Sequence, residues 1–265
     1  MLQKTFFTFL FILLFEGISF GQTKIVSWNI QNFGNQKSPY ISLIAKLLND
    51  VDIVLIQEVQ VDIDGKQAIK LLETELEKSG NQWTSTISAP THGRGTECYA
   101  YLWKSKKVTL QNHAWLEISL DSLIDREPFL ARFTIGKKTI LLANFHAVPK
   151  KKMPWLEIAE LDKLDKLYKK DNLIIAGDFN LEASNRAFDE LKTYGFKAAL
   201  SDIRTTIKME QQNEEKFAHE YDNFIVEKAE FAILSSGRID FTTHFTNLQE
   251  ARKISDHLPI YVILK

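Results

Sequence analysis

The sequence predicts one α/β domain in which antiparallel hairpins are mixed with parallel strands joined by crossovers. Strand-like and helix-like runs alternate along the chain, which is the pattern of such a domain. No linker, low-complexity tract or internal repeat divides these runs. The chain has 265 residues, 45% of them hydrophobic, which is enough to bury one large core.

The first 21 residues are expected to lie outside this domain. They contain one lysine, an apolar run from Phe6 to Phe15, and small residues at Ser19 and Gly21 that suit cleavage. Glu16 interrupts the apolar run before it is long enough to cross a bilayer. The pattern predicts a secretory signal peptide at 1–21, a mature domain at 22–265 and a secreted or periplasmic protein. A helix that lies in the membrane interface is the alternative interpretation.

The elements of the domain follow from residue type and spacing. Eight runs rich in branched and aromatic residues predict strands at 24–30, 52–58, 98–104, 128–135, 138–145, 172–178, 221–227 and 259–265. Apolar residues at helical spacing predict helices around residues 44–48, around residues 69–76, and from Pro154 to Tyr168. Gly136 lies between two strand-like runs and predicts a hairpin.

Charge and cysteine content narrow the function classes. The formal net charge is -1, so no global field attracts the molecule to nucleic acid or to an anionic membrane. Any binding of a polyanion must therefore come from local basic clusters. The single cysteine, Cys98, excludes an intrachain disulfide, and its place in a strand-like run predicts a core position.

Polar side chains recur where the predicted strands begin or end. Each has an ordinary structural explanation: Asp178 and Asn180 are frequent turn formers, and an isolated His146 is more often a satisfied core histidine. Chance is a poor explanation for the whole set, because strand ends are where an α/β fold builds its sites. The set comprises Asn29, Glu58, His146, Asp178, Asn180, Asp222, Asp256 and His257.

This set of side chains suits the hydrolysis of a phosphodiester. A histidine exchanges protons near neutral pH, and a carboxylate partner fixes its tautomer and raises its basicity. Oxygen ligands from Glu, Asp and Asn suit magnesium or calcium better than zinc. The sequence has no HExxH, CxxC or Gly-rich phosphate loop.

The chain resembles the endonuclease/exonuclease/phosphatase superfamily. The matching motifs are SWNIQNFG (27–34), VLIQEV (54–59), ANFHAV (143–148), AGDFN (176–180) and SDHLPI (255–260). Three further segments resemble deoxyribonuclease I: TECYAYLWK (96–104), REPFLARF (126–133) and EYDNFIV (220–226). The motifs occur in order from residue 24 to the C-terminus.

The resemblance implies a fold and a role for each matched residue. The fold would be a four-layer sandwich of two mostly antiparallel sheets with helices on the outside. The implied roles are the following: Glu58 holds a divalent metal with Asn29 and Asp256 beside it; His146 pairs with Glu97 and His257 with Asp222; Asp178 and Asn180 orient water and phosphoryl oxygen; Arg126 grips a substrate phosphate.

Three positions depart from the deoxyribonuclease I pattern. Gln60 and Gln31 stand where that pattern has arginines, and Gly95 stands where it has a tyrosine that packs on the sugar. Glutamine carries no charge to be attracted into a narrow minor groove, so these changes weaken the expectation of the usual duplex grip. Arg94 or Lys104 are candidate substitutes.

The resemblance implies a secreted endonuclease that hydrolyses DNA by histidine acid/base catalysis with Mg2+, for which Ca2+ or Mn2+ are alternatives. DNA is the expected partner, as substrate; we expect a monomer without stable membrane association. The alternatives are a phosphoesterase of lipid or sugar phosphates and a catalytically inactive binding module. The basic segment PKKKMPW (149–155) has two open interpretations, a flank of the site that steers phosphate or a solvated helix start.

Overall fold

The computed structural model describes residues 21–227 and 232–265. The predicted signal peptide lies outside the described residues, apart from Gly21, and stays a prediction. Within the two described ranges, no helix has the length and apolar character needed to cross a bilayer.

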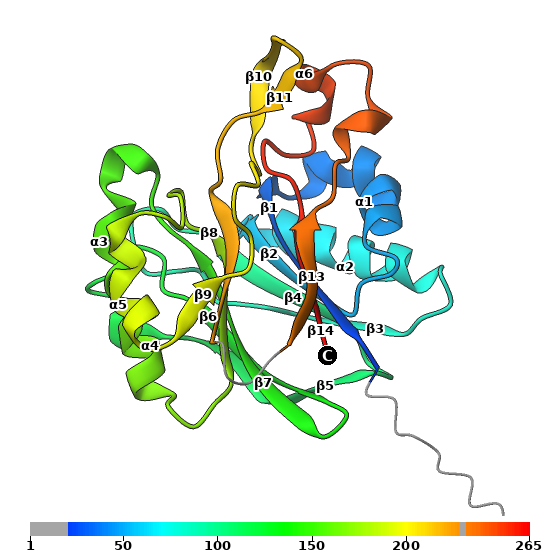
Figure 1. Ribbon diagram of the computed structural model, residues 1–265. Helices are drawn as coiled ribbons and strands as arrows, with labels where there is room; N and C mark the ends of the chain where they lie inside the picture. Colours follow the sequence, from blue (N-terminus) through cyan, green and yellow to red (C-terminus); the bar gives the residue numbers. More distant parts are fainter. Residues whose placement is uncertain (1–20, 228–231) are drawn as a thin grey trace, which may run out of the picture.

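Two six-stranded sheets form the centre of the molecule, and each has one parallel pair among antiparallel neighbours. Sheet I has the order β13 (Ile233–Arg238), β14 (Ile260–Leu264), β1 (Thr23–Phe33), β2 (Ile53–Val59), β4 (Cys98–Lys104), β3 (Trp83–Ile87). Sheet II has the order β5 (Val108–Leu116), β6 (Phe129–Ile135), β7 (Lys138–His146), β8 (Leu173–Asp178), β12 (Asp222–Glu227), β9 (Phe196–Ala198). A separate hairpin, β10 (Ile207–Gln212) and β11 (Glu215–Phe217), projects from the top of the molecule in Figure 1.

Helices cover the outer face of each sheet, which gives four layers (Figure 1). The helices α1 (Ile41–Leu47), α2 (Ile63–Glu77) and α6 (Leu248–Ala251) pack on sheet I. The helices α3 (Pro154–Ile158), α4 (Asp162–Leu167) and α5 (Asp189–Thr193) pack on sheet II. Five short 3-10 helices lie in the connections: η1 (Asn35–Tyr40), η2 (Ile118–Leu120), η3 (Lys150–Lys152), η4 (Arg186–Phe188) and η5 (Thr242–His244). The four-layer sandwich expected from the sequence is confirmed.

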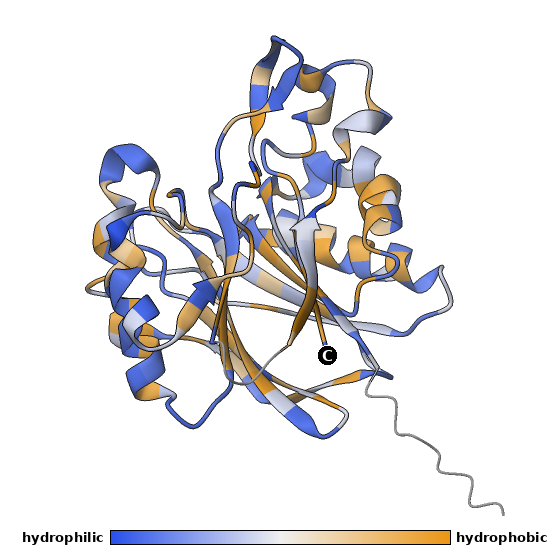
Figure 2. Cartoon of the chain, in the orientation of Figure 1, coloured by the Kyte–Doolittle hydropathy of each residue, from blue (hydrophilic) through white to orange (hydrophobic). Residues whose placement is uncertain are grey.

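Three apolar clusters hold the layers together. The central cluster joins the facing sides of the two sheets through residues such as Ile25, Leu55, Phe133 and Ile174, all of them fully buried. The other two clusters lie between each sheet and its helices. In Figure 2 the strands are mostly hydrophobic, while hydrophilic colour gathers on the outward sides of the helices and on the β10–β11 hairpin. Cys98 is buried in this core, as predicted.

The eight predicted strands are the four interior strands of each sheet, and all eight are confirmed. The predicted hairpin at Gly136 joins β6 to β7, with a positive φ of 60° that glycine adopts without strain. One helix prediction is wrong: the segment from Pro154 to Tyr168 forms two short helices. At the break, the backbone N–H of Leu161 donates to Ile158 O and that of Leu164, in α4, donates to Leu161 O. This i+3 spacing replaces the i+4 spacing of an α-helix, and the side chains of all three residues lie in the core.

Candidate active site

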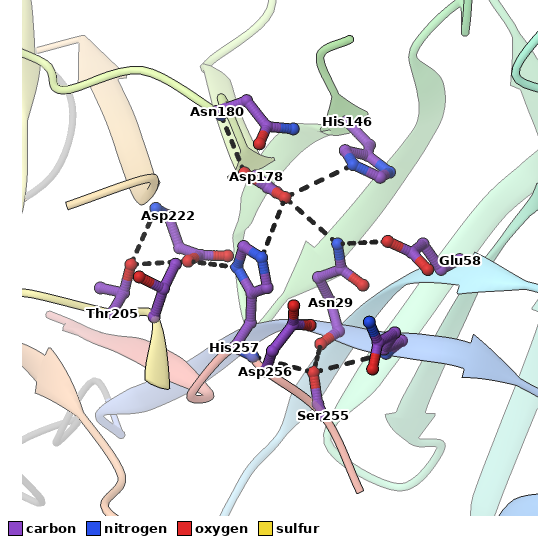
Figure 3. A network of polar contacts seen from close by, with 12 residues as sticks. Asn29, Glu58, His146, Asp178, Asn180, Thr205, Asp222, Ser255, Asp256 and His257 are labelled. Carbon is purple, nitrogen blue, oxygen red and sulfur yellow. Dashed lines mark hydrogen bonds and ion pairs between the residues drawn. The ribbon is translucent and has the colours of Figure 1, made fainter. Parts of the chain in front are cut away.

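The parallel pairs explain why the site forms where it does. Parallel strands end at the same edge of a sheet, so β1 and β2 bring Asn29 and Glu58 together, and β7 and β8 bring His146 opposite Asp178. Strand β12 runs antiparallel to β8, so its first residue, Asp222, also pairs with Asp178. The two sheets meet at this edge, and the loop before β14 adds residues 255–257 (Figure 3).

Asp178 lies at the centre of the polar network in Figure 3. Its Oδ2 is 3.4 Å from Nε2 of His146 and 3.5 Å from Nε2 of His257, and it accepts a 3.1 Å hydrogen bond from Nδ2 of Asn29. Its Oδ1 accepts a hydrogen bond from the backbone N–H of Asn180 at 2.8 Å. Residues from both sheets and from the last loop therefore converge on one buried carboxylate.

His146 is held by Glu97, which Arg126 holds in turn. Nδ1 of His146 lies 3.0 Å from Oε2 of Glu97, and the Arg126 guanidinium donates to the same oxygen at 3.2 Å. Burial and Arg126 lower the pKa of His146, but Glu97 and Asp178 outweigh them and the net shift is upward. Burial raises the pKa of Glu97, but His146 and Arg126 outweigh it, so Glu97 stays ionised.

Arg126 itself is buried, and its nitrogens are already engaged. Beyond Glu97, it donates to the main-chain oxygens of His146 and Ala147. These bonds give Arg126 a positioning role for the Glu97–His146 pair, whereas the contact with substrate phosphate stays a prediction. The structure therefore offers a different reason for an arginine at this position than the one expected from the sequence.

His257 is held by Asp222 in a second pair. Nδ1 of His257 lies 2.8 Å from Oδ2 of Asp222, which also accepts a 2.6 Å hydrogen bond from the hydroxyl of Thr205. Burial lowers the pKa of His257, but Asp222 and Asp178 raise it by more than burial lowers it. The net shift of this pKa is well upward. Burial raises the pKa of Asp222 to about 6, against the lowering by His257. Both histidines thus keep Nε2 directed at Asp178 while a carboxylate occupies Nδ1.

Asn29 and Glu58 offer oxygen atoms that could form part of the ligand set of a metal ion. Nδ2 of Asn29 donates to Oε1 of Glu58 at 2.9 Å, and Oδ1 of Asn29 is buried with no hydrogen-bond partner among the described residues. A buried acceptor without a donor is costly, and a cation satisfies it. Glu58 also adopts a positive φ of 60°, a strained conformation of the kind found at functional sites. This oxygen set fits a hard divalent ion such as magnesium.

Asp256 approaches this pair from the last loop. The buried amine of Lys37 lies close enough to Glu58 and Asp256 for both carboxylates to raise its pKa, against a larger lowering by burial. Lys37 donates to the main-chain oxygens of Lys253 and Ile254, at 2.9 and 2.7 Å, so it fastens the loop that carries Asp256. Asp256 is also 3.3 Å from the guanidinium of Arg252.

A second group of possible ligands consists of Asp178, Asp222 and His257, whose ligand atoms lie within 4.8 Å of one another. The hydrogen bond between His257 and Asp222 already accounts for this proximity. A cation at Nδ1 of His257 would replace that bond, whereas a cation at Asn29 and Glu58 would satisfy an orphaned oxygen. The orphaned oxygen therefore keeps Asn29 and Glu58, with Asp256 beside them, as the other candidate position for a cation.

Asn180 has a positive φ of 50° and donates from Nδ2 to the main-chain oxygen of Ala147 at 2.9 Å. It lines a cavity of about 550 Å³ together with Tyr221, Asp256 and His257. A second cavity of about 570 Å³ is lined by Glu58, Gln60, Arg94 and Arg126, among others. Members of the network therefore line both cavities: Asn180 and His257 line the first, and Glu58 and Glu97 line the second.

Of the two candidate substitutes for the missing arginines, only Arg94 lies at the site. Lys104 is at the far end of β4, where it donates to the main-chain oxygen of Asn49, so the suggestion that it replaces an arginine is wrong. Its strand begins next to Glu97, and seven residues of extended chain span roughly 20 Å.

Sequence reasoning missed three residues that support the site: Thr205, Ser255 and Lys37. The hydroxyl of Ser255 donates to the main-chain oxygen of Asn29 at 2.6 Å and accepts from the backbone N–H of His257 at 3.0 Å. Ser255 stands beside two predicted site residues, which was a usable signal. Thr205 lies in an irregular segment and Lys37 in the short 3-10 helix η1, and no sequence pattern marks either residue.

Comparison with known proteins gives consistent matches. The profile of the Endonuclease/Exonuclease/phosphatase family matches residues 26–257. Deoxyribonuclease-1-like 1 of Homo sapiens is 30% identical over an alignment of 278 positions, with 97% of this chain and 88% of that protein covered. A humanized TDP2 of D. rerio has a TM-score of 0.66 at 16% identity and covers 92% of this chain and 99% of its own. A mannosyl-6-phosphatase of Bacteroides thetaiotaomicron has a TM-score of 0.64 at 15% identity, with 92% and 99% covered.

Proposed function

Because this chain belongs to the endonuclease/exonuclease/phosphatase family, we propose that it is a divalent-metal-dependent endonuclease that hydrolyses phosphodiester bonds of DNA. One observation carries the proposal: two imidazoles, each backed by its own carboxylate, direct Nε2 at the same oxygen of Asp178. The resemblance to a deoxyribonuclease-1-like protein over nearly the whole chain supports DNA as the substrate class. The solved structures at 15–16% identity support the fold alone.

The two histidines divide the proton transfers. One Nε2 accepts a proton from the attacking water, and the other donates a proton to the leaving oxygen. Asp178 lies between them and, with the amide of Asn180, orients the water and a phosphoryl oxygen. Glu97 and Asp222 hold the tautomers by occupying Nδ1, and Arg126 and Thr205 hold those carboxylates in place.

Asn29, Glu58 and Asp256 hold the divalent cation in this proposal, and Mg2+ is the ion that best suits their oxygen atoms. When bound there, such a cation neutralises charge on the phosphoryl group and stabilises the leaving oxygen.

Plasmid nicking tests the proposal. Supercoiled DNA should be nicked in the presence of Mg2+ and stay intact in EDTA. His146→Ala should lower the rate by about 10²- to 10⁴-fold, the usual contribution of a general acid or base. His113→Ala is the matched control, because His113 is exposed on the edge strand β5. Parallel digestion of duplex DNA, single-stranded DNA and RNA defines the preferred strand.

A different outcome would favour another member of the family. If the wild-type protein leaves plasmid intact but releases phosphate from a sugar phosphate or choline phosphate from a lipid, the DNase proposal is wrong. If it hydrolyses none of these substrates, a binding module is the better description.

Export is a separate proposal that depends on residues 1–21. Mass spectrometry of the protein from its own cells should find an N-terminus near Gln22 in the periplasmic or extracellular fraction. An intact N-terminus in the membrane fraction would support the interfacial anchor instead.

A further inference from the structure

A basic segment with exposed apolar side chains leaves the site directly after β7. Residues 150–155 consist of three lysines followed by Met153, Pro154 and Trp155. The lysines are all exposed, Met153 is 47% exposed and Trp155 is 39% exposed. Trp155 is the most exposed of the five tryptophans, all of which lie within residues 21–227. We call residues 150–155 the basic segment.

The basic segment lies beside the candidate active site. Asn180 donates to the main-chain oxygen of Ala147, which fixes the chain three residues before Lys150. The amine of Lys150 lies 3.7 Å from Glu182 and 5.9 Å from the ring centre of Tyr221, and that ring lines the cavity next to His257. Lys150 and Lys152 follow His146 by four and six residues, so their backbones lie within about 14 and 21 Å of it.

The charges of two of the three lysines in this segment are not neutralised locally. Across the described ranges, neither Lys151 nor Lys152 forms an ion pair, whereas Lys163 and Lys166 on the neighbouring helices pair with Glu160 and Asp162. The net charge of the whole chain is only -1, so this cluster is a local positive feature and not part of a basic surface. Among the described residues, Lys151 and Lys152 are adjacent cations without an acidic partner, and Lys150 beside them is 3.7 Å from Glu182, so the cluster keeps a positive charge that is complementary to a polyanion.

We infer that the basic segment binds the phosphate backbone of a nucleic-acid strand on one side of the scissile phosphate. This inference rests on the proposed function and specifies where the substrate leaves the site. With backbone phosphates about 3.4 Å apart along the helix axis, Lys150–Lys152 reach phosphates within roughly six nucleotides of the cut. Trp155 offers a face on which an unpaired base stacks.

The same residue types also suit an anionic membrane, because Met153, Trp155 and Leu156 are exposed beside the lysines. Position favours the nucleic acid. The segment adjoins a cavity lined by Asn180 and His257, so a strand held in that cavity continues over the lysines, whereas a bilayer bound there would cover the cavity and exclude a polymer.

Salt-dependent binding tests the inference. Fluorescence anisotropy measures the affinity for a labelled 30-nucleotide DNA in EDTA, which prevents cleavage, over a series of salt concentrations. Lys151→Gln/Lys152→Gln should reduce the slope of log K against log salt by about 1.4 to 1.8, because each lost phosphate contact contributes about 0.7 to 0.9. Lys169→Gln/Lys170→Gln is the matched control: both lysines are exposed and precede β8, at the end away from Asp178.

The control should keep the wild-type slope, and both double variants should hydrolyse bis(p-nitrophenyl) phosphate like the wild type. DNA should also quench tryptophan fluorescence, and Trp155→Phe should remove most of that quenching. An unchanged slope in Lys151→Gln/Lys152→Gln overturns the inference, as does binding to vesicles of phosphatidylcholine and phosphatidylserine without binding to DNA. If the wild-type protein binds DNA but does not cleave it in Mg2+, the proposed function is contradicted and this inference is not.

Discussion

Asn29 donates a 2.9 Å hydrogen bond from Nδ2 to Glu58, while the other atom of its amide, Oδ1, is a buried acceptor with no donor among the described residues. The amide nitrogen of Asn29 is engaged by two carboxylates, because Asp178 also accepts a hydrogen bond from it. The amide is therefore locked with its oxygen outward from the carboxylates. A fixed acceptor oxygen beside the carboxylate of Glu58 is preorganised for a cation.

Removal of the Glu58 charge should weaken metal binding. We expect Glu58→Gln to raise the Kd for Mg2+ by tenfold or more, since it replaces a charged oxygen ligand with a neutral one. Isothermal titration calorimetry measures this constant, and Glu77→Gln at the end of α2 is the control. Equal Mg2+ affinity in wild type and Glu58→Gln would place the cation elsewhere, with Asp178, Asp222 and His257 as the next candidates.

Arg126 and Glu97 should move the pKa of His146 in opposite directions. Arg126 lowers that pKa and Glu97 raises it. Arg126→Met should therefore raise the pKa of His146, and Glu97→Gln should lower it. NMR titration of the imidazole Cε1–H resonance checks both directions.

Arg126→Met should also destabilise the fold, because it leaves the buried carboxylate of Glu97 without its cation. Breaking a buried ion pair costs about 3 to 5 kcal/mol. Urea denaturation measures the free energy of unfolding.

For the NMR titration, a shift of the His146 pKa in the same direction in Arg126→Met and Glu97→Gln would show that the two residues do not act on this pKa separately.

The pH dependence of hydrolysis should be displaced toward alkaline pH. Both histidines have raised pKa values, so each imidazole stays protonated above the ordinary value of 6.5. The histidine that accepts a proton must first lose its own, so kcat/KM should rise with pH above 6.5 and fall again when the proton donor is deprotonated.

Asp222→Asn should lower the pKa of His257, because Asp222 is the largest influence that raises it, and the limb of the profile that belongs to His257 should move to lower pH. Folding stability follows the same sign. A histidine with a raised pKa in the folded protein stabilises the fold fully below the unfolded pKa and loses this contribution as pH rises through the folded pKa. A profile identical to wild type would remove His257 from the reaction.

A buried amide bridge between the sheets should contribute to stability. Gln57 of β2 donates to Oδ1 of Asn144 of β7 at 2.6 Å, and Asn144 donates to the main-chain oxygens of Ile56 and Ala100. Asn144→Leu removes these hydrogen bonds, although Gln57 keeps its 3.0 Å bond to the hydroxyl of Ser27, and should cost about 1 to 3 kcal/mol for each buried group left unsatisfied. Urea denaturation checks the loss, and an unchanged midpoint would contradict it.

The interior strands could be predicted from the sequence because both faces are covered and their apolar runs are nearly continuous. The four strands that the sequence analysis missed in the sheets, β3, β5, β9 and β13, are the four edges. Strand β5 exposes Gln111, Asn112 and His113 in succession, so backbone pairing to β6, and not hydrophobic patterning, holds it in place. Edge strands carry polar residues that hide the strand signal.

The members of the candidate site were predictable as polar residues at strand ends, but their distances were not. Contact between His146 and Glu97, 49 residues apart, depends on how sheet I packs on sheet II. Thr205 reaches Asp222 from an irregular loop, and Lys37 reaches the last loop across the chain; neither position follows from residue spacing. The break between α3 and α4 likewise depends on the shape of the core.

Because the site is divided between two sheets, the rate of hydrolysis reports whether the two sheets are packed against each other. Sheet I supplies Asn29 and Glu58, while sheet II supplies His146 and Asp178. A state that keeps both ladders of hydrogen bonds but loosens the cluster between them would retain its far-UV circular dichroism and lose turnover, because the two halves would drift apart by more than a hydrogen-bond length. Mild denaturant should therefore abolish hydrolysis at a lower concentration than the one that unfolds the strands.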